Sequence, residues 1–184
     1  MSDQLEVLTL VATRLDTAGI PYMVTGSLAA SRYATPRFTR DIDIVLDIDD
    51  AGAARLARAL EDEFYVEEHT LRSAVARSGM ANVIHLRLLV KVDLIVRKDT
   101  PYRREEFGRR RPVAIGDTTI WFVAPEDLVL SKLVWMRDSA SEFQRRDVEA
   151  LVSSVGDLDR DYINRWAGEL GVAETWREIS DAAS

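Results

Sequence analysis

Asp41 and Asp43 are separated by a single residue, Ile42. They begin the segment 41–48, whose β-branched residues predict a strand. Side chains two residues apart in a strand project from the same face, so these carboxylates lie together, roughly 7 Å apart at Cα. Ile42 and Ile44 then face the core. Two adjacent unpaired carboxylates repel each other and are stabilised by a cation. Since hard divalent ions prefer oxygen ligands, the pair predicts a site for Mg²⁺ or Mn²⁺.

A third carboxylate, Asp93, interrupts the apolar, strand-like run VKVDLIV, where an unpaired charge is costly. Either it joins the aspartate pair at the metal site, or it faces water on an edge strand or pairs with a nearby arginine. In the first case three carboxylates can hold two ions about 4 Å apart, an arrangement that stabilises the attacking and leaving oxygens of a displacement. The extra carboxylate could also act as general base towards an acceptor hydroxyl.

Gly26 and Ser27 follow a strand-like run, residues 22–25, and precede helix-forming residues 28–33. Glycine lets a phosphate approach the backbone closely, and a helix N-terminus offers the phosphate unpaired N–H groups. Ser27 adds a hydroxyl donor, although it serves equally well as a simple helix N-cap. With the aspartate pair on the next strand, the two features can face one ligand, which favours phosphate binding at Gly26 and Ser27.

The elements that position these residues alternate between helix and strand in the first third of the chain. Helical spacing of apolar residues over 4–18 predicts a helix that ends at Gly19. An alanine-rich helix is predicted over about 51–62. Residues 82–89 and 91–96 are predicted to form an antiparallel pair or two halves of a meander.

The last third of the chain is predicted to be helical. A hairpin turn at Gly116-Asp117 precedes it, and Pro125 stands at the start of the first helix. Ser141 and Gln144 have the spacing of a capping box, which predicts a second helix running to about residue 154. The fold class is therefore α+β, or mixed α/β. We expect a core over residues 1–124 and a C-terminal helical segment, residues 125–184, packed on it.

Composition describes an ordinary globular chain of 184 residues, 47% hydrophobic and 30% charged, without cysteine. The absence of thiols fits a reducing cytoplasm, and the absence of a long apolar run predicts no membrane span. A net charge of −7 disfavours broad nonspecific nucleic-acid binding. The locally basic segment 97–111 is either a solvated loop or short helix, or a patch that meets triphosphate or a polynucleotide acceptor.

Gly26-Ser27, Asp41-Ile42-Asp43 and Asp93 together resemble the signature of the nucleotidyltransferase superfamily of the DNA polymerase β type. More narrowly, the chain resembles small bacterial AbiEii-like nucleotidyltransferases, many of them toxin-associated. The resemblance covers about residues 4–155. It implies a small mixed sheet flanked by helices, followed by a helical segment. It also implies transfer of a nucleoside monophosphate from a nucleoside triphosphate to a hydroxyl on tRNA, protein or a small molecule, with a cognate antitoxin as a further partner.

Four residues outside the carboxylate group are also candidates. The segment from Glu126 to Val152 is similar to the family's helix pair, which implies that Lys132 contacts phosphates and that Arg146 and Asp147 form a second motif. Physically, Lys132 lies within an apolar helix, so the alternative is a lysine that extends its ammonium into solvent. Arg40 precedes the aspartate pair directly and either contacts triphosphate or pairs with a nearby aspartate.

Two other functions compete with an active nucleotidyltransferase. One is a nucleotide-binding or regulatory module that keeps the pocket without turnover, and a toxin–antitoxin component spans both classes. The other is a glycosyltransferase that uses Asp-x-Asp with a metal and a nucleotide sugar. The upstream Gly26-Ser27 and the later strand aspartate Asp93 fit the glycosyltransferase less well.

Overall fold

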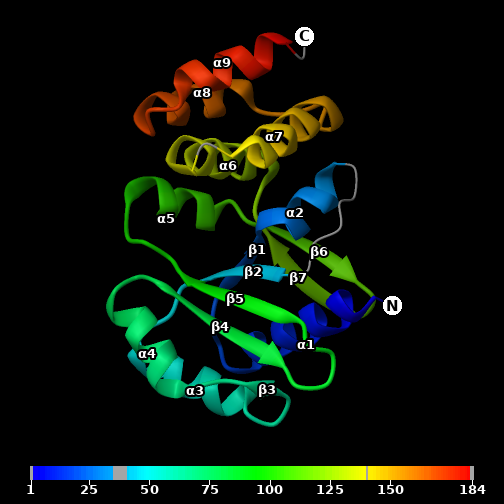
Figure 1. Cartoon of the computed structure of the whole chain (residues 1–184), viewed down its shortest axis with the longest axis vertical. Helices are drawn as coiled ribbons and strands as arrows, with labels where there is room; N and C mark the ends of the chain where they lie inside the picture. The colour runs from blue at the N-terminus through cyan, green and yellow to red at the C-terminus, as the bar shows by residue number, and fades with distance from the viewer. Residues whose placement is uncertain (1, 35–40, 140, 183–184) are drawn as a thin grey trace. The chain divides into compact units, whose positions relative to one another are not determined.

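The computed structural model describes residues 2–34, 41–139 and 141–182 (Figure 1). Contacts divide the chain into two units. Unit 1 comprises Met1–Leu28 and Phe38–Phe122, and unit 2 comprises Ala29–Arg37 and Val123–Ser184. Within the described ranges, no helix has the length and apolar character that crossing a membrane requires.

Unit 1 is built on a mixed sheet whose order is β3-β4-β5-β2-β1-β7-β6. Its strands are β1 (Tyr22–Thr25), β2 (Asp41–Leu46), β3 (Phe64–Tyr65), β4 (Met80–His85), β5 (Lys91–Val96), β6 (Arg111–Ile115) and β7 (Thr118–Phe122). β2 pairs with β5, and β1 with β7, in parallel, while the other neighbours are antiparallel. The central strand of this order, β2, and its neighbour β5 carry the predicted carboxylates.

The helices that begin in unit 1 are α1 (Asp3–Thr17), α2 (Gly26–Tyr33), α3 (Asp50–Leu60), α4 (Glu68–Ala76) and α5 (Pro101–Gly108). Contacts join α1 to α3 and α3 to α4, and α4 also packs against β4 and β5. The apolar stripe of α1 is fully buried at Val11 and Leu15, as its spacing predicts. Ile42 and Ile44 are likewise fully buried, so the alternate residues of β2 project from the opposite face.

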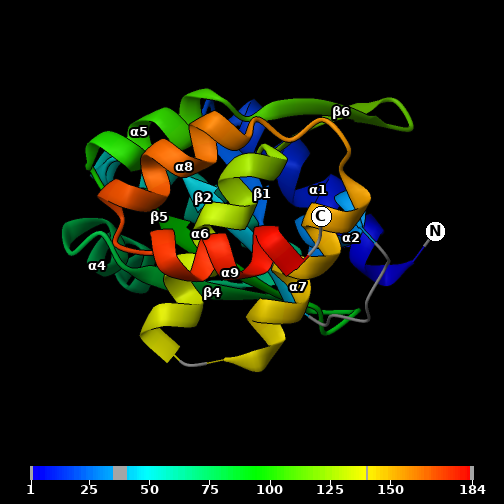
Figure 2. The same ribbon diagram turned by 90° about the horizontal axis from the view of Figure 1, so that it is seen from above.

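Unit 2 contains α6 (Pro125–Ser139), α7 (Glu142–Ser154), α8 (Arg160–Glu169) and α9 (Ala173–Ala182). α6 contacts α7 and α8, and α9 contacts α7 and α8 (Figure 2). Trp166 and Trp176 are buried in this bundle, and the Trp176 indole donates to Asn164 Oδ1 over 2.7 Å. The Tyr162 hydroxyl donates to Asp127 Oδ1 over 2.6 Å, which links α8 to the start of α6.

The α+β class predicted from the sequence is confirmed, and two local predictions were wrong. The strand expected over 82–89 ends at His85, because Leu89, with φ of 53°, closes a turn that returns the chain into β5. The capping box at Ser141 does not form: Ser141 is the N-cap of α7, but its side chain makes no capping hydrogen bond. Gln144 instead accepts a hydrogen bond from Lys132. The basic segment contains α5, a short helix.

Candidate active site

The register between β2 and β5 brings the three predicted aspartates together on one face of the sheet. Asp43 is paired with Asp93 and Asp41 with Lys91 across these parallel strands. Residues paired on neighbouring strands point to the same face and lie about 5 Å apart. Asp41 and Asp43 are partly exposed, opposite the buried isoleucine face of β2. Three carboxylates and one ammonium therefore share a small area of the sheet.

Lys91 lies between two of these carboxylates. Its Nζ is 3.0 Å from Asp93 Oδ2 and 3.2 Å from Asp41 Oδ2. Hydrogen bonds to Asp93 and to Asp41 raise the pKa of the Lys91 ammonium above its ordinary value, so it stays charged near neutrality. The formal charges of Asp41, Asp43, Asp93 and Lys91 sum to −2. The group retains an excess of negative charge that a divalent cation can neutralise.

Asp93 is the most enclosed of the carboxylates that contact Lys91. Its side chain is 10% exposed, compared with 47% for Asp41. The Asn82 amide on β4 donates to Asp93 Oδ1, while Lys91 donates to the other oxygen. β5 lies between β4 and β2, so Asp93 is not on an edge strand, and its described partners are a lysine and an amide. Both oxygens of this carboxylate are held in a defined orientation.

Gly26 connects the strand–helix junction to the aspartate pair. Its φ is +66°, and α2 begins at this residue, one position before the N-cap predicted at Ser27. A Cβ on Gly26 would lie 2.0 Å from Asp43 Oδ2 and 2.7 Å from Asp43 Cγ. Only glycine leaves room for the Asp43 carboxylate here. The first turn of α2 therefore begins beside Asp43.

The donor set fits a hard divalent cation in its chemistry, because carboxylate oxygens are the ligands that Mg²⁺ prefers. In the part of the chain that the structure describes, however, no three acidic, histidine or cysteine side chains are arranged as a ready metal site. The Lys91 ammonium contacts one oxygen of Asp41 and one of Asp93.

Lys132, the implied phosphate contact, lies against Asp147 of the second motif within unit 2. Lys132 is 3% exposed, and its Nζ lies 2.6 Å from Asp147 Oδ2 and 3.2 Å from Gln144 Oε1. The alternative of a lysine extended into solvent is therefore wrong, because the ammonium is buried against an aspartate. Arg146 is exposed on α7. Arg40 lies outside the described residues.

Four arginines of the basic segment 97–111 contact nearby acids or aromatic rings. Arg97 contacts Asp47 and Asp99 at 3.0 and 3.5 Å. Arg104 also contacts Asp99, at 2.7 Å. The Arg103 guanidinium donates to both Glu106 oxygens at 2.8 and 2.9 Å, and Arg110 stacks over the rings of Phe107 and Trp121. The contacts of these four arginines, and the short helix α5 within the segment, fit the interpretation of a solvated short helix.

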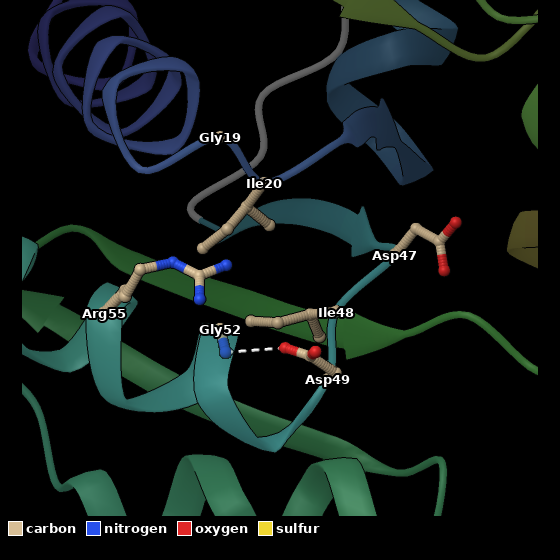
Figure 3. A pocket seen from close by; sticks show the side chains of 7 residues that line it. All are labelled: Gly19, Ile20, Asp47, Ile48, Asp49, Gly52 and Arg55. Atoms are coloured by element: carbon tan, nitrogen blue, oxygen red, sulfur yellow. Dashed lines mark hydrogen bonds between the residues drawn. The ribbon is translucent and has the colours of Figure 1, made fainter.

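A surface hollow of about 350 Å³ lies at the other end of β2, beyond Leu46 (Figure 3). Its lining includes Asp47, Asp49 and Arg55, and Asp49 caps α3 by accepting from Gly52 N over 2.7 Å. Among the predicted site residues that the structure describes, none lines this hollow.

Lys91 and Asn82 are the site residues that the sequence analysis did not identify. Lys91 precedes Asp93 by two positions in a strand, and this spacing alone places both side chains on one face. The strand alternation was therefore a usable signal for Lys91. Asn82 depends on the antiparallel register of β4 with β5, which pairs it with Asp93. Sequence spacing does not give that register.

No family model and no curated protein sequence matches this chain, whereas solved structures do. A nucleotidyltransferase-like antigenic protein from Paracoccidioides brasiliensis superimposes with a TM-score of 0.61 at 18% identity, covering 94% of this chain and 92% of that one. The antibiotic-resistance factor ANT(2'')-Ia, solved with adenylyl-2''-tobramycin, superimposes with a TM-score of 0.61 at 11% identity, covering 92% of this chain and 98% of that one. The lincosamide antibiotic adenylyltransferase LnuA, with lincomycin bound, superimposes with a TM-score of 0.53 at 13% identity, covering 84% of this chain and 99% of that one. The chain has the nucleotidyltransferase fold.

Proposed function

We propose that this protein is a metal-dependent nucleotidyltransferase, which moves a nucleoside monophosphate from a nucleoside triphosphate to a hydroxyl and releases pyrophosphate. The observation that carries the proposal is the contact between Gly26 and Asp43, which places the N-terminus of α2 beside the carboxylates of β2 and β5. Phosphate-binding N–H groups and metal-binding oxygens then face one ligand. The nucleotidyltransferase fold supports the same reaction.

Each residue of the site has a role in this reaction. Asp41 and Asp43 are the proposed ligands of Mg²⁺ or Mn²⁺, and Asp93 is a further ligand. A bound divalent ion would neutralise charge on the phosphates and on the leaving pyrophosphate. Gly26 and Ser27 bind phosphate oxygens at the N-terminus of α2. Asp93, whose Oδ1 accepts a hydrogen bond from Asn82, is also the proposed acceptor of the proton of the attacking hydroxyl.

We further propose that the acceptor is a small hydroxyl-bearing molecule rather than a polynucleotide. The net charge of −7 opposes binding to a polyanion, and Arg97, Arg104 and Arg110 of the 97–111 segment contact acids or rings. Two structures of the same fold contain an adenylylated antibiotic or a bound antibiotic. Protein and tRNA acceptors are the competing outcomes of the test.

The decisive test is label transfer. Wild-type protein would be incubated with Mg²⁺, each α-³²P nucleoside triphosphate and one of three acceptor pools: hydroxyl-bearing antibiotics, total tRNA or lysate protein. Parallel reactions with γ-³²P nucleotides distinguish nucleotidyl from phosphoryl transfer. We expect α-label, and no γ-label, on the antibiotic pool, and its loss in Asp41→Asn. Transfer to tRNA or protein would overturn the acceptor assignment. Metal-dependent nucleotide binding without any transfer would indicate the catalytically silent module instead.

A further inference from the structure

We propose that Lys91 is a resident counter-cation of the carboxylate group, which a divalent ion must displace from Asp41 and Asp93 when it binds. The inference rests on the proposed function, because it takes these aspartates as metal ligands. It assigns to Lys91 a role as competitor for the metal site. The role is distinct from phosphate binding and from proton transfer.

The contacts of Lys91 place its charge where a metal charge would lie. Its Nζ reaches Asp93 Oδ2 and Asp41 Oδ2 at 3.0 and 3.2 Å, so the ammonium bridges carboxylates on two strands. An ion such as Mg²⁺ binds carboxylate oxygens at about 2.0–2.1 Å and needs the same oxygens. An ammonium and a divalent ion that contact the same carboxylate oxygen lie only a few ångströms apart and repel each other strongly. The ammonium and the ion therefore exclude each other from the shared oxygens.

The burial of the three side chains shows how this exchange can take place. The Lys91 side chain is 37% exposed and that of Asp41 is 47% exposed, whereas that of Asp93 is 10% exposed. A flexible lysine stem that already reaches solvent can withdraw its ammonium at little cost. Asp93 cannot gain water as easily, and Asn82 holds its other oxygen. Lys91 can thus move away from Asp93, which stays in place.

Removal of Lys91 has two expected consequences, one for the stability of the metal-free chain and one for its affinity for a divalent ion. Removal of Lys91 changes the summed formal charge of the group from −2 to −3, since three carboxylates remain without the ammonium. The repulsion among the carboxylates then rises, which destabilises the metal-free fold. The same change favours binding of a divalent ion, because no resident cation competes with it. Lys91 therefore stabilises the metal-free state and weakens metal affinity.

The test is Mn²⁺ binding without nucleotide, measured by electron paramagnetic resonance of free Mn²⁺, on wild type, Lys91→Met and Lys91→Arg. Lys98→Met, which removes an exposed lysine farther along the same segment, controls for net charge. We expect Lys91→Met to bind Mn²⁺ at least about tenfold more tightly than both wild type and Lys98→Met. Lys91→Arg, which keeps the charge, should stay near wild type. Thermal unfolding should show metal-free Lys91→Met below wild type, with the difference removed by saturating Mn²⁺.

Unchanged or weaker Mn²⁺ binding by Lys91→Met, with wild-type binding intact, would overturn the role of Lys91 and leave the proposed function standing. Absence of Mn²⁺ binding in both proteins would overturn the metal site itself, and with it the proposed function. An equal gain in Lys98→Met would show a general charge effect and would also refute the exchange at Lys91.

Discussion

Substitution of Gly26 by alanine tests whether the strand–helix junction and the aspartate pair form one site. Gly26 has φ of +66°, and its missing Cβ would lie 2.0 Å from Asp43 Oδ2 and 2.7 Å from Asp43 Cγ. Both separations are far below van der Waals contact, so the Asp43 side chain must rotate away or the backbone must shift. In the first case Asp43 leaves its position beside Asp93, and in the second the start of α2 moves relative to the carboxylates.

The magnitude follows from two separate costs. An alanine held at positive φ costs about 1–2 kcal/mol of stability, and forcing extra atoms into a packed site costs about 1–3 kcal/mol more. Gly19 has the same φ of +66°, but nothing lies within 4 Å of its missing Cβ. Gly19→Ala therefore carries the backbone cost alone. The difference between the two variants isolates the collision with Asp43.

The assay compares wild type, Gly26→Ala and Gly19→Ala by urea unfolding, Mn²⁺ binding and α-³²P transfer. We expect both variants to lose stability, with Gly26→Ala losing about 1–3 kcal/mol more than Gly19→Ala because of the collision with Asp43. Mn²⁺ binding and transfer should fall at least about tenfold in Gly26→Ala and remain near wild type in Gly19→Ala. The reasoning is refuted if Gly26→Ala matches Gly19→Ala in Mn²⁺ affinity and transfer, because the collision would then have no effect on the site.

Three further predictions concern single side chains. Asn82→Ala removes the donor that orients Asp93, so kcat should fall about tenfold with little change in KM for the nucleotide, as steady-state kinetics would show. Asp147→Ala leaves the buried Lys132 ammonium without its carboxylate and should cost about 3–5 kcal/mol in urea unfolding. Burial raises the pKa of Tyr22 from 10.0 to about 12, so the folded state keeps a proton that the unfolded state loses. Stability of the wild type should therefore fall by about 2 kcal/mol between pH 10 and pH 12, relative to Tyr22→Phe.

Two of these predictions have a comparison variant, and the third has a clear contradicting outcome. Arg146→Ala changes the exposed neighbour of Asp147 and should alter stability by no more than about 0.5 kcal/mol. A comparable loss in both variants would contradict the importance of the buried ion pair. Tyr22→Phe should match wild type below pH 10, and parallel pH profiles throughout would contradict the assignment of the alkaline transition to Tyr22. An Asn82→Ala variant with unchanged kcat would show that Asp93 needs no orienting donor.

The strand pattern around the aspartates was predictable because it depends on local chemistry. The two-residue period of β2 places Ile42 and Ile44 in the core and Asp41 and Asp43 on the opposite face, and the structure shows this arrangement. The Gly26-Ser27 junction was also visible as a strand–helix transition. Its contact with Asp43 depends on the antiparallel pairing of β1 with β2, in which Thr25 lies opposite Asp43.

What could not be predicted depends on contacts between distant segments. The pairing of Asn82 with Asp93 requires the register of β4 and β5, and a shift of one residue would direct Asn82 to the other face. The capping box failed because Lys132, twelve residues earlier than Gln144, offers its ammonium to the glutamine side chain. Short strands such as β3, with two residues, carry no periodic signal at all.

The proposed function depends most directly on Asp43 and Asp93, which are the carboxylates proposed to bind the catalytic metal beside the N-terminus of α2. Its most direct test measures α-³²P transfer to the acceptor pool by wild type, Asp43→Asn, Asp93→Asn and Asp47→Asn. Asp47 is a matched control, because it is exposed at the opposite end of β2 and pairs with Arg97 over 3.0 Å. We predict wild-type transfer by Asp47→Asn and losses of at least about 100-fold in the other two variants. Transfer retained by Asp43→Asn or Asp93→Asn, or absent from the wild type, would contradict the account.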